Sequence, residues 1–224
     1  MEHPWRQVGA DLFHMEGQNF LLRVDYHSRY LEVITLRNTS SQAMISAITS
    51  VKVRFGIPEV LRSDNGPQFS SYVFASFAKN YGFSHVTSTP GYPQSNGAVE
   101  RAVHTVKDLF RKSNDCFLAL VAYRDTPAVT GYSASQLLMC RWLQTRAPRD
   151  PGKLSPEIPP PDIFSQRDTT AKKRQARNFN RRHGVREFRD PSSGEEVWVT
   201  DAEFRGQVSA ESSGTRTSWK HPGV

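Results

Sequence analysis

The sequence predicts an α/β protein in which a mixed five-stranded sheet is flanked by helices. Three strand-like segments follow one another near the N-terminus with only short breaks between them, which is typical of an antiparallel meander. Two further strand-like segments then alternate with amphipathic helices, and a strand-helix-strand crossover places its strands parallel. A sheet that contains both kinds of connection is mixed.

The meander is predicted over residues 8–13, 20–26 and 30–36. Thr39 and Gln42 have the spacing of a capping box, so a helix is expected to follow and to end at residues 56–58, Gly-Ile-Pro. The fourth strand is expected to end at Asp64.

A second amphipathic helix is predicted to close at Gly82, and residues 83–87 are predicted to form the fifth strand. Residues 89–97 hold two prolines and two glycines, which predicts a mobile loop. The helix that follows carries Glu100 in its first turns.

Four regions are expected along the chain. Residues 1–145 form the compact domain, with further helices at 117–123 and 133–139, and residues 146–167 form a proline-rich linker. Residues 168–189 form a basic segment that is helical over 168–182, and residues 190–224 form a partial small β region.

The net charge of +7 is concentrated in one segment. Between Lys172 and Arg189 there are eight Lys or Arg residues and one acid, Glu187, so this segment carries the whole excess. It is expected to bind nucleic acid, although a solvated helix face or a disordered tail would explain the pattern as well. The start of the chain does not resemble a signal peptide, no apolar run is long enough to cross a membrane, and two cysteines fit a reducing compartment. A nuclear location, or a cytoplasmic one before nuclear entry, is therefore expected.

Three carboxylates are the candidate catalytic residues. Asp11 lies in a strand, Asp64 ends another strand before the turn Asn65-Gly66, and Glu100 lies early in a helix. Such side chains can converge on hard cations, which prefer oxygen ligands. Glu100 shares a helix face with His104, Lys107 and Arg111, which is suited to gripping a phosphate backbone, but an ordinary solvent-facing surface has the same pattern.

Several other residues have simpler interpretations. Asp25 is expected to cap a turn, with a role as an extra site carboxylate as the alternative. His85 and His104 are expected to pack or contact backbone. Trp5 and Trp142 are expected to be core or interface aromatics.

Four motifs in order resemble the catalytic core of retroviral and long-terminal-repeat retrotransposon integrases, with a Ty3/gypsy-like character, over about residues 4–142. They are Pro4-Trp5 ahead of Val8-Gly9-Ala10-Asp11, then Val24-Asp25-Tyr26-His27-Ser28-Arg29-Tyr30, Ser63-Asp64-Asn65-Gly66-Pro67-Gln68-Phe69 and Pro93-Gln94-Ser95-Asn96-Gly97-Ala98-Val99-Glu100-Arg101. The start of the family's C-terminal region is similar to residues 181–185 and 196–199.

The resemblance implies an RNase H-like fold and an enzyme whose acidic triad, Asp11, Asp64 and Glu100, binds two Mg²⁺ or Mn²⁺ ions. It implies polynucleotidyl transfer in DNA integration, with 3′-end processing followed by strand transfer of element DNA into target DNA. It also implies a homodimer or higher oligomer, and neither a membrane nor a small-molecule substrate is expected. The residues expected to contact DNA are Gln94, Asn96, His104, Lys107, Arg111, Lys172, Lys173, Arg174, Arg177, Arg181 and Arg182.

Departures from the family leave alternatives open. The family's N-terminal zinc domain is not in this sequence, and the C-terminal β region looks incomplete, so a retroelement-derived fragment is expected. Ala134 and Cys140 stand where relatives more often carry Pro and Gly. The alternative function is a catalytically silent nucleic-acid-binding protein derived from a retroelement, and a cellular nuclease of the same fold is disfavoured by the motifs around Asp64 and Glu100.

Overall fold

The computed structural model describes residues 3–87, 97–183, 196–199, 204–208 and 219–220. Two compact units are present, Met1–Lys172 and Lys173–Val224, and each is described by itself. None of the described helices is both long enough and apolar enough to cross a membrane.

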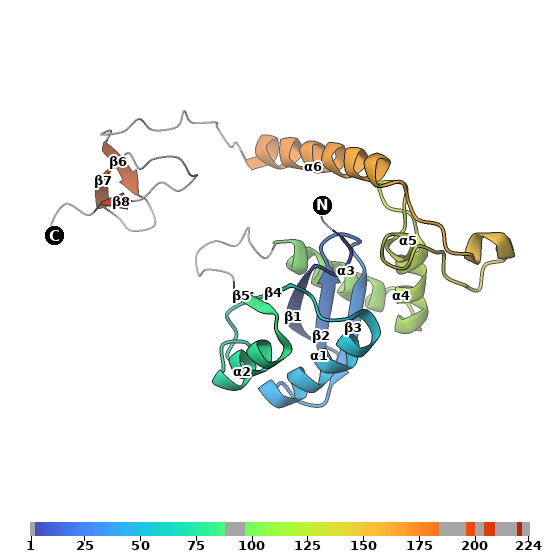
Figure 1. The fold of residues 1–224 in the computed structure, drawn as a ribbon, viewed down its shortest axis with the longest axis horizontal. Coiled ribbons are helices and arrows are strands. Elements are labelled where there is room, and N and C mark those ends of the chain that lie inside the picture. The colour runs from blue at the N-terminus through green and yellow to red at the C-terminus, as the bar shows by residue number, and fades with distance from the viewer. Residues whose placement is uncertain (1–2, 88–96, 184–195, 200–203, 209–218, 221–224) are drawn as a thin grey trace. The chain divides into compact units, whose positions relative to one another are not determined.

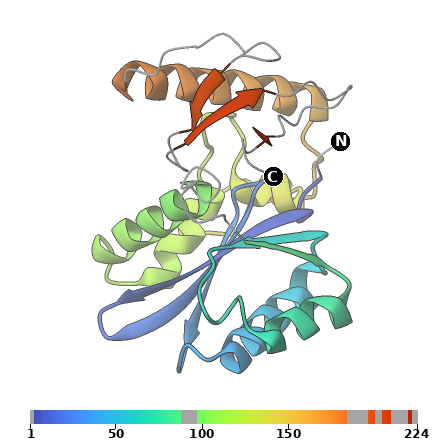
Figure 2. The ribbon, with the colours of Figure 1, turned by 90° about the vertical axis from the view of Figure 1, so that its left-hand side faces the viewer.

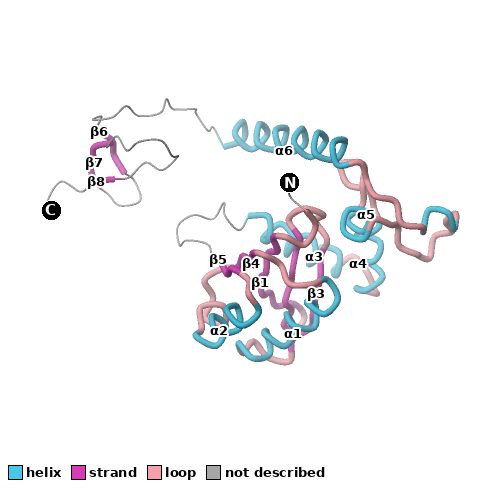
Figure 3. Tube along the Cα trace, viewed as in Figure 1, coloured by secondary structure: helices cyan, strands magenta, loops and turns pink. Residues whose placement is uncertain are grey.

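The first unit is built on a five-stranded sheet with the strand order β3-β2-β1-β4-β5 (Figures 1 and 3). β1, β2 and β3 form the antiparallel meander, whereas β4 and β5 run parallel to β1, which confirms the predicted mixed sheet. The strands are β1 (Gln7–Met15), β2 (Gln18–Asp25), β3 (Leu31–Leu36), β4 (Val60–Ser63) and β5 (Ser84–Thr87).

Helices cover both faces of this sheet (Figure 2). α1 (Ser41–Phe55) and α2 (Tyr72–Tyr81) pack on one face around Leu21, Leu61 and Phe74. α3 (Gly97–Arg111) and α4 (Cys116–Asp125) pack on the other face around Leu22, Phe13 and Val106. The short helix α5 (Ala134–Met139) follows α4. The two faces are called the α1 face and the α3 face below.

The ends of the first two helices are set by local hydrogen bonds. The expected capping box at Thr39 was wrong by one residue, because Ser40 accepts a hydrogen bond from the Ala43 amide at 3.2 Å while Asn38 accepts from the Ser40 amide and hydroxyl. Gly82 ends α2 in the left-handed conformation, with φ 69°, as expected for a C-terminal glycine.

The α1 face also buries two cationic side chains. Arg23 on β2 is fully buried, and none of its side-chain nitrogens has a hydrogen-bond partner in the described structure. Lys52 on α1 is 5% exposed, and its Nζ lies 3.5–4.5 Å from the ring centroids of Phe77, Tyr81 and Phe83. Burial, together with the charge of Arg23, lowers the pKa of Lys52 to about 7. These aromatic faces partly replace the hydration of the ammonium group.

The predicted linker is held against the first unit. Arg149 pairs with the buried Asp125 at 2.6 Å, and the amide of Glu157 donates to the Cys140 carbonyl at 2.5 Å. The region contains a 3₁₀ turn, η2 (Pro151–Leu154), and the start of α6 (Pro161–His183). This helix was expected to begin at residue 168, but it begins at Pro161. Proline is favoured at the first helical position, and Asp162 adds a stabilising negative charge in the first turn.

The second unit contains the rest of α6 and a three-stranded antiparallel sheet, ordered β6-β7-β8. Its strands are β6 (Glu196–Val199), β7 (Phe204–Val208) and β8 (Trp219–Lys220). Strands thus occur within residues 190–224, where the small β region was predicted.

Candidate active site

Asp11 and Asp64 come together because β1 and β4 are neighbouring parallel strands. Ala10 on β1 is in register with Ser63 on β4, and each of these residues is followed directly by an aspartate. Side chains alternate along a strand, and Ala10 belongs to the core of the α1 face. Both aspartates therefore face the α3 side of the sheet, at the same level.

Glu100 is brought to the same side by the close approach of α3 to β1. Gly9 is the residue that permits this approach, because a Cβ atom at Gly9 would overlap the Cγ2 methyl of Val99 and would lie 3.2 Å from the Tyr26 hydroxyl. Val99 is fully buried, and Glu100 is the next residue along the helix. A glycine inside a strand commonly marks such an approach.

Asp64 and Glu100 act electrostatically on Asp11. The pKa of Asp11 is raised from 3.8 to about 6, mainly by burial and then by the negative charges of Asp64 and, more weakly, Glu100. The hydrogen bond from the Leu12 amide, at 2.8 Å, and the charge of Lys107 act in the opposite direction. In the described part of the chain no basic side chain forms an ion pair with any of the three. The cluster is therefore a site of net negative charge.

Asp64 is held by its own turn. Its carboxylate accepts a hydrogen bond from the Gly66 amide at 3.2 Å, and the Ser63 hydroxyl donates to its backbone carbonyl at 2.7 Å. The Ser63 hydroxyl also lies 2.9 Å from Nε2 of His85, a half-buried ring that packs against Phe69 and Phe74. Burial lowers the pKa of His85. His85 is therefore a packing residue, as expected.

The donor set suits a hard divalent cation, since it consists of three carboxylates with no paired base. The side chains are not closed around an ion: within the described ranges, no group of three or more His, Cys, Asp or Glu side chains is arranged to hold a metal. The chemistry of the cluster thus fits a divalent metal.

The residues expected to contact DNA lie in several places. On α3, His104 and Arg111 both pair with Asp108, at 3.4 and 3.5 Å, while Lys107 lies 5.7 Å from the ring centroid of Phe13. Gln94 and Asn96 lie outside the described residues. The α6 cations that were expected to contact DNA are all exposed, and Lys172 pairs with Asp168 at 2.7 Å; they are Lys172, Lys173, Arg174, Arg177, Arg181 and Arg182.

Asp25 is a turn residue, and it is not part of the carboxylate cluster. It is fully buried on the α1 face, where it accepts hydrogen bonds from the Trp5 amide at 3.0 Å and from the Ser28 amide and hydroxyl at 2.9 and 2.6 Å. Trp5 is 6% exposed and donates from Nε1 to the Gly56 carbonyl at 3.1 Å. Both residues thus have the structural roles that were predicted.

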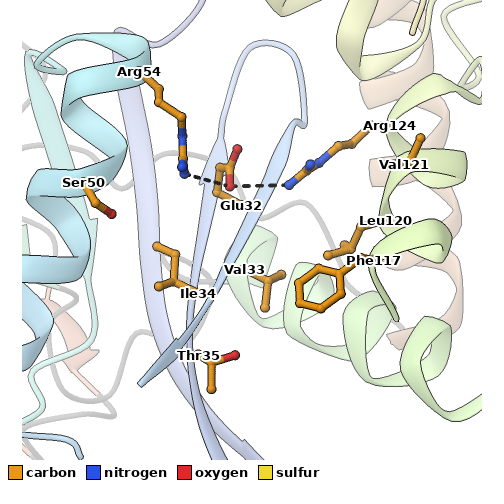
Figure 4. Close-up of a pocket in the computed structure, with 10 residues that line it drawn as sticks. All are labelled: Glu32, Val33, Ile34, Thr35, Ser50, Arg54, Phe117, Leu120, Val121 and Arg124. Carbon is orange, nitrogen blue, oxygen red and sulfur yellow. Dashed lines mark hydrogen bonds and ion pairs between the residues drawn. The ribbon is translucent and has the colours of Figure 1, made fainter. Parts of the chain in front are cut away.

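A separate cavity of about 530 Å³ lies on the edge strand β3, between α1 and α4 (Figure 4). Glu32 lies at its centre and pairs with Arg54 and Arg124, each at 3.4 Å. A second cavity, of about 600 Å³, is lined by Tyr26, His27 and Phe164. Neither cavity includes a residue of the carboxylate cluster.

The sequence motifs did not assign a role to Gly9 or Tyr26. The signal for Gly9 was available, because it is a glycine within a strand two residues before Asp11. Tyr26 shows its importance only in three dimensions, where its hydroxyl is buried without a hydrogen-bond partner in the described structure.

The mixed sheet with helices on both faces is the RNase H-like fold of integrase catalytic cores. Residues 2–93 match the family model described as "Integrase core domain", and this part of the chain is similar to that family. The match ends before Glu100, which lies in α3.

Relatives and solved structures agree with this assignment. The chain is 34% identical over 155 residues, 64% of its length, to an uncharacterized protein of Caenorhabditis elegans, and 30% identical over 156 residues, 62% of its length, to the Pol polyprotein of feline endogenous virus ECE1. It spans only 12% and 15% of those two proteins.

Among solved structures, the catalytic core domain of BIV integrase superposes with a TM-score of 0.53 at 24% identity, covering 60% of this chain and 94% of that one. A simian T-cell lymphotropic virus intasome, solved in complex with PP2A regulatory subunit B56 gamma, gives a TM-score of 0.58 at 18% identity and covers 98% of this chain and 68% of that one. At these identities the structures establish the fold.

Proposed function

We propose that this chain is a polynucleotidyl transferase of DNA integration, in which Asp11, Asp64 and Glu100 hold two divalent metal ions, Mg²⁺ or Mn²⁺. The observation that carries the proposal is the raised pKa of Asp11, about 6, which burial and the charges of Asp64 and Glu100 cause in a cluster without a paired base. The match of residues 2–93 to the integrase core domain model supports the same reaction class. The HTLV-2 integrase catalytic core domain in its dimeric form, which superposes with a TM-score of 0.50, was solved in complex with magnesium and supplies a precedent for the metal.

In this proposal each carboxylate has a distinct setting. Asp11 is fixed by the central strand β1, Asp64 by the turn that its own carboxylate caps, and Glu100 by the helix that Val99 anchors at Gly9. The bound ions would activate the attacking oxygen and stabilise the leaving oxygen of an in-line displacement at phosphorus. Lys107 lies on the same side as Asp11 and would orient a DNA phosphate next to the carboxylates.

The wider assignment follows from the relatives. We propose that the DNA substrates are element ends and target DNA, that the steps are 3′-end processing and strand transfer, and that the exposed cations of α6 contact the backbone. A homodimer or higher oligomer acting in the nucleus belongs to the same proposal.

The test is strand transfer and disintegration on branched DNA in Mg²⁺ or Mn²⁺, with Asp64→Asn and Glu100→Gln run beside the unaltered chain. Each substitution should abolish turnover while leaving DNA binding in chelator unchanged or stronger, because it removes negative charge. Lys79→Ala, at an exposed cation in the last turn of α2, is the matched surface control and should retain activity. Activity that survives in both carboxylate variants would refute the proposal.

A second candidate is a nucleic-acid-binding protein without catalysis. It is favoured by one observation, that the described side chains include no closed set of three metal ligands. DNA binding without turnover in either metal would select this candidate.

A further inference from the structure

His85 and Ser63 form a short chain of hydrogen bonds that ends on the backbone of Asp64. Ser63 is the last residue of β4 and is 1% exposed, and its hydroxyl donates to the Asp64 carbonyl at 2.7 Å. Nε2 of His85, on the neighbouring strand β5, lies 2.9 Å from the same hydroxyl oxygen. The Ser63 hydroxyl therefore joins the imidazole ring to the residue that follows it.

The number of available protons sets the direction of this chain. A serine hydroxyl has one proton, and that of Ser63 is donated to the Asp64 carbonyl. The contact with His85 is then a hydrogen bond only if Nε2 carries a proton and donates it to the Ser63 oxygen. Burial lowers the pKa of His85 and favours the neutral ring, so the structure assigns the tautomer with its hydrogen on Nε2.

His85 supports both ends of the turn that carries Asp64. The Asp64 carboxylate accepts a hydrogen bond from the Gly66 amide at 3.2 Å, and the Gly66 carbonyl accepts from the Phe69 amide at 3.0 Å. The ring of Phe69 packs against that of His85, with 6.1 Å between the centroids. Because the peptide after Asp64 is planar, fixing its carbonyl also fixes the direction of the chain toward Gly66, which holds the carboxylate.

This support comes from the face of the sheet opposite to the carboxylates. Leu61 belongs to the core of the α1 face, and Ser63 is two residues further along the same strand, so both side chains point to that face. His85 is in register with Leu61 and packs against Phe74 of α2. The Asp64 carboxylate faces the α3 side. His85 therefore acts on it through Ser63 and the backbone.

We propose that His85 and Ser63 are positioning residues, which hold the Asp64 carboxylate where the metal-dependent reaction needs it. Without the donor at position 85, the Ser63 hydroxyl loses its own anchor, and the peptide that leads from Asp64 to Gly66 gains freedom. The inference rests on the proposed function for the role of Asp64 as a metal ligand. The hydrogen bonds themselves do not depend on that role.

The experiment removes the donor and the ring separately. His85→Phe keeps an aromatic ring against Phe69 and Phe74 and loses the donor, whereas His85→Gln loses the ring and keeps an N–H donor. Turnover on branched DNA should fall about 10-fold to 100-fold in His85→Phe and stay within about threefold of the unaltered chain in His85→Gln. DNA binding in chelator should be unchanged in both. A residue that only packs would give the opposite order of turnover.

Two measurements on the metal-free chain test the positioning directly. Nitrogen NMR of the imidazole ring should find the hydrogen of His85 on Nε2. The Gly66 amide should exchange with solvent about tenfold faster in His85→Phe and in Ser63→Ala, and close to its original rate in His85→Gln. The double variant Ser63→Ala/His85→Phe should exchange no faster than either single variant, because each breaks the same chain.

Phe77→Leu is the control for loss of packing. Phe77 lies in the same core, and its described ring contacts are with Lys52, Phe74, Tyr81 and Phe83. This variant should lower the melting temperature and leave the exchange of the Gly66 amide and the turnover unchanged.

An unchanged exchange rate of the Gly66 amide in His85→Phe would overturn the inference, and so would the other tautomer of His85 or an equal loss of turnover in His85→Gln. The exchange and tautomer measurements need neither metal nor turnover. A chain that meets both expectations but transfers no strand would therefore refute the proposed catalysis and leave the positioning of Asp64 established.

Discussion

Gly9→Ala tests whether the close approach of α3 to β1 determines the position of Glu100 in the carboxylate cluster. The new methyl group would overlap Cγ2 of Val99 and would lie 3.1 Å from Cγ1 of Val24. Val99 is fully buried on a helix, where a β-branched side chain has one strongly preferred rotamer, so it cannot simply turn away. Overpacking of this kind costs about 1–3 kcal/mol of the free energy of unfolding.

The matched variant is Val99→Ala, which removes the Cγ2 methyl that Gly9 faces together with Cγ1, and should cost about 2 kcal/mol through the cavity that it leaves. In the double variant the new methyl occupies part of that space. The two costs should therefore not add, and the double variant should be more stable than their sum predicts by about 1–2 kcal/mol.

Urea unfolding of the four proteins at one pH gives this coupling directly. In Gly9→Ala, NMR titration should also show a lower pKa for Asp11, because α3 and Glu100 move away from it. A Gly9→Ala variant within about 0.5 kcal/mol of the unaltered chain, or additive costs in the double variant, would refute the reasoning.

Four further outcomes follow from the described contacts. The pKa of Asp11 is raised in the folded state to about 6, so the folded state loses stability as pH rises from about 4 through 6. Asp11→Asn should therefore raise the free energy of unfolding by about 1–2 kcal/mol at pH 7 and leave it unchanged at pH 3. Urea titrations at the two pH values would reveal the difference. Millimolar Mg²⁺ or Mn²⁺ should raise the melting temperature of the unaltered chain, and scanning calorimetry should find this shift absent in Asp64→Asn. The pKa of Lys52 is lowered to about 7, so the folded chain gains stability as pH rises from about 7 toward 10. Lys52→Met should remove this dependence of the free energy of unfolding on pH and should stabilise the protein most below pH 7. Chemical denaturation at a series of pH values measures both effects. Asp25→Ala should cost about 3 kcal/mol because it leaves the Trp5 and Ser28 donors buried without an acceptor, and thermal unfolding followed by circular dichroism would detect the loss.

Local patterns were sufficient to predict the sheet and the positions of the carboxylates. The apolar runs of β1 and β2, the short breaks between them and the glycine that ends α2 are properties of a few adjacent residues, so they can be read before the fold is known. The register of Ala10 with Ser63 explains why the aspartates that follow these two residues become neighbours.

Features that depend on distant partners were not predictable in this way. Lys52 interrupts the apolar pattern of α1, and only the rings of Phe77, Tyr81 and Phe83 make its burial tolerable. The contacts that hold residues 149 and 157 against Asp125 and Cys140 also join residues far apart in the sequence. The significance of Gly9 becomes clear only when Val99 is seen opposite it.

The parallel pairing of β1 with β4 separates two kinds of sequence change. The stretch between Asp11 and Asp64 contains a hairpin, a third strand and α1, and its turns can gain or lose residues without moving either aspartate. A shift of β4 by a single residue would instead turn Asp64 to the opposite face of the sheet. Insertions in the turns thus leave the carboxylate cluster in place, whereas a one-residue deletion within β4 would remove Asp64 from it.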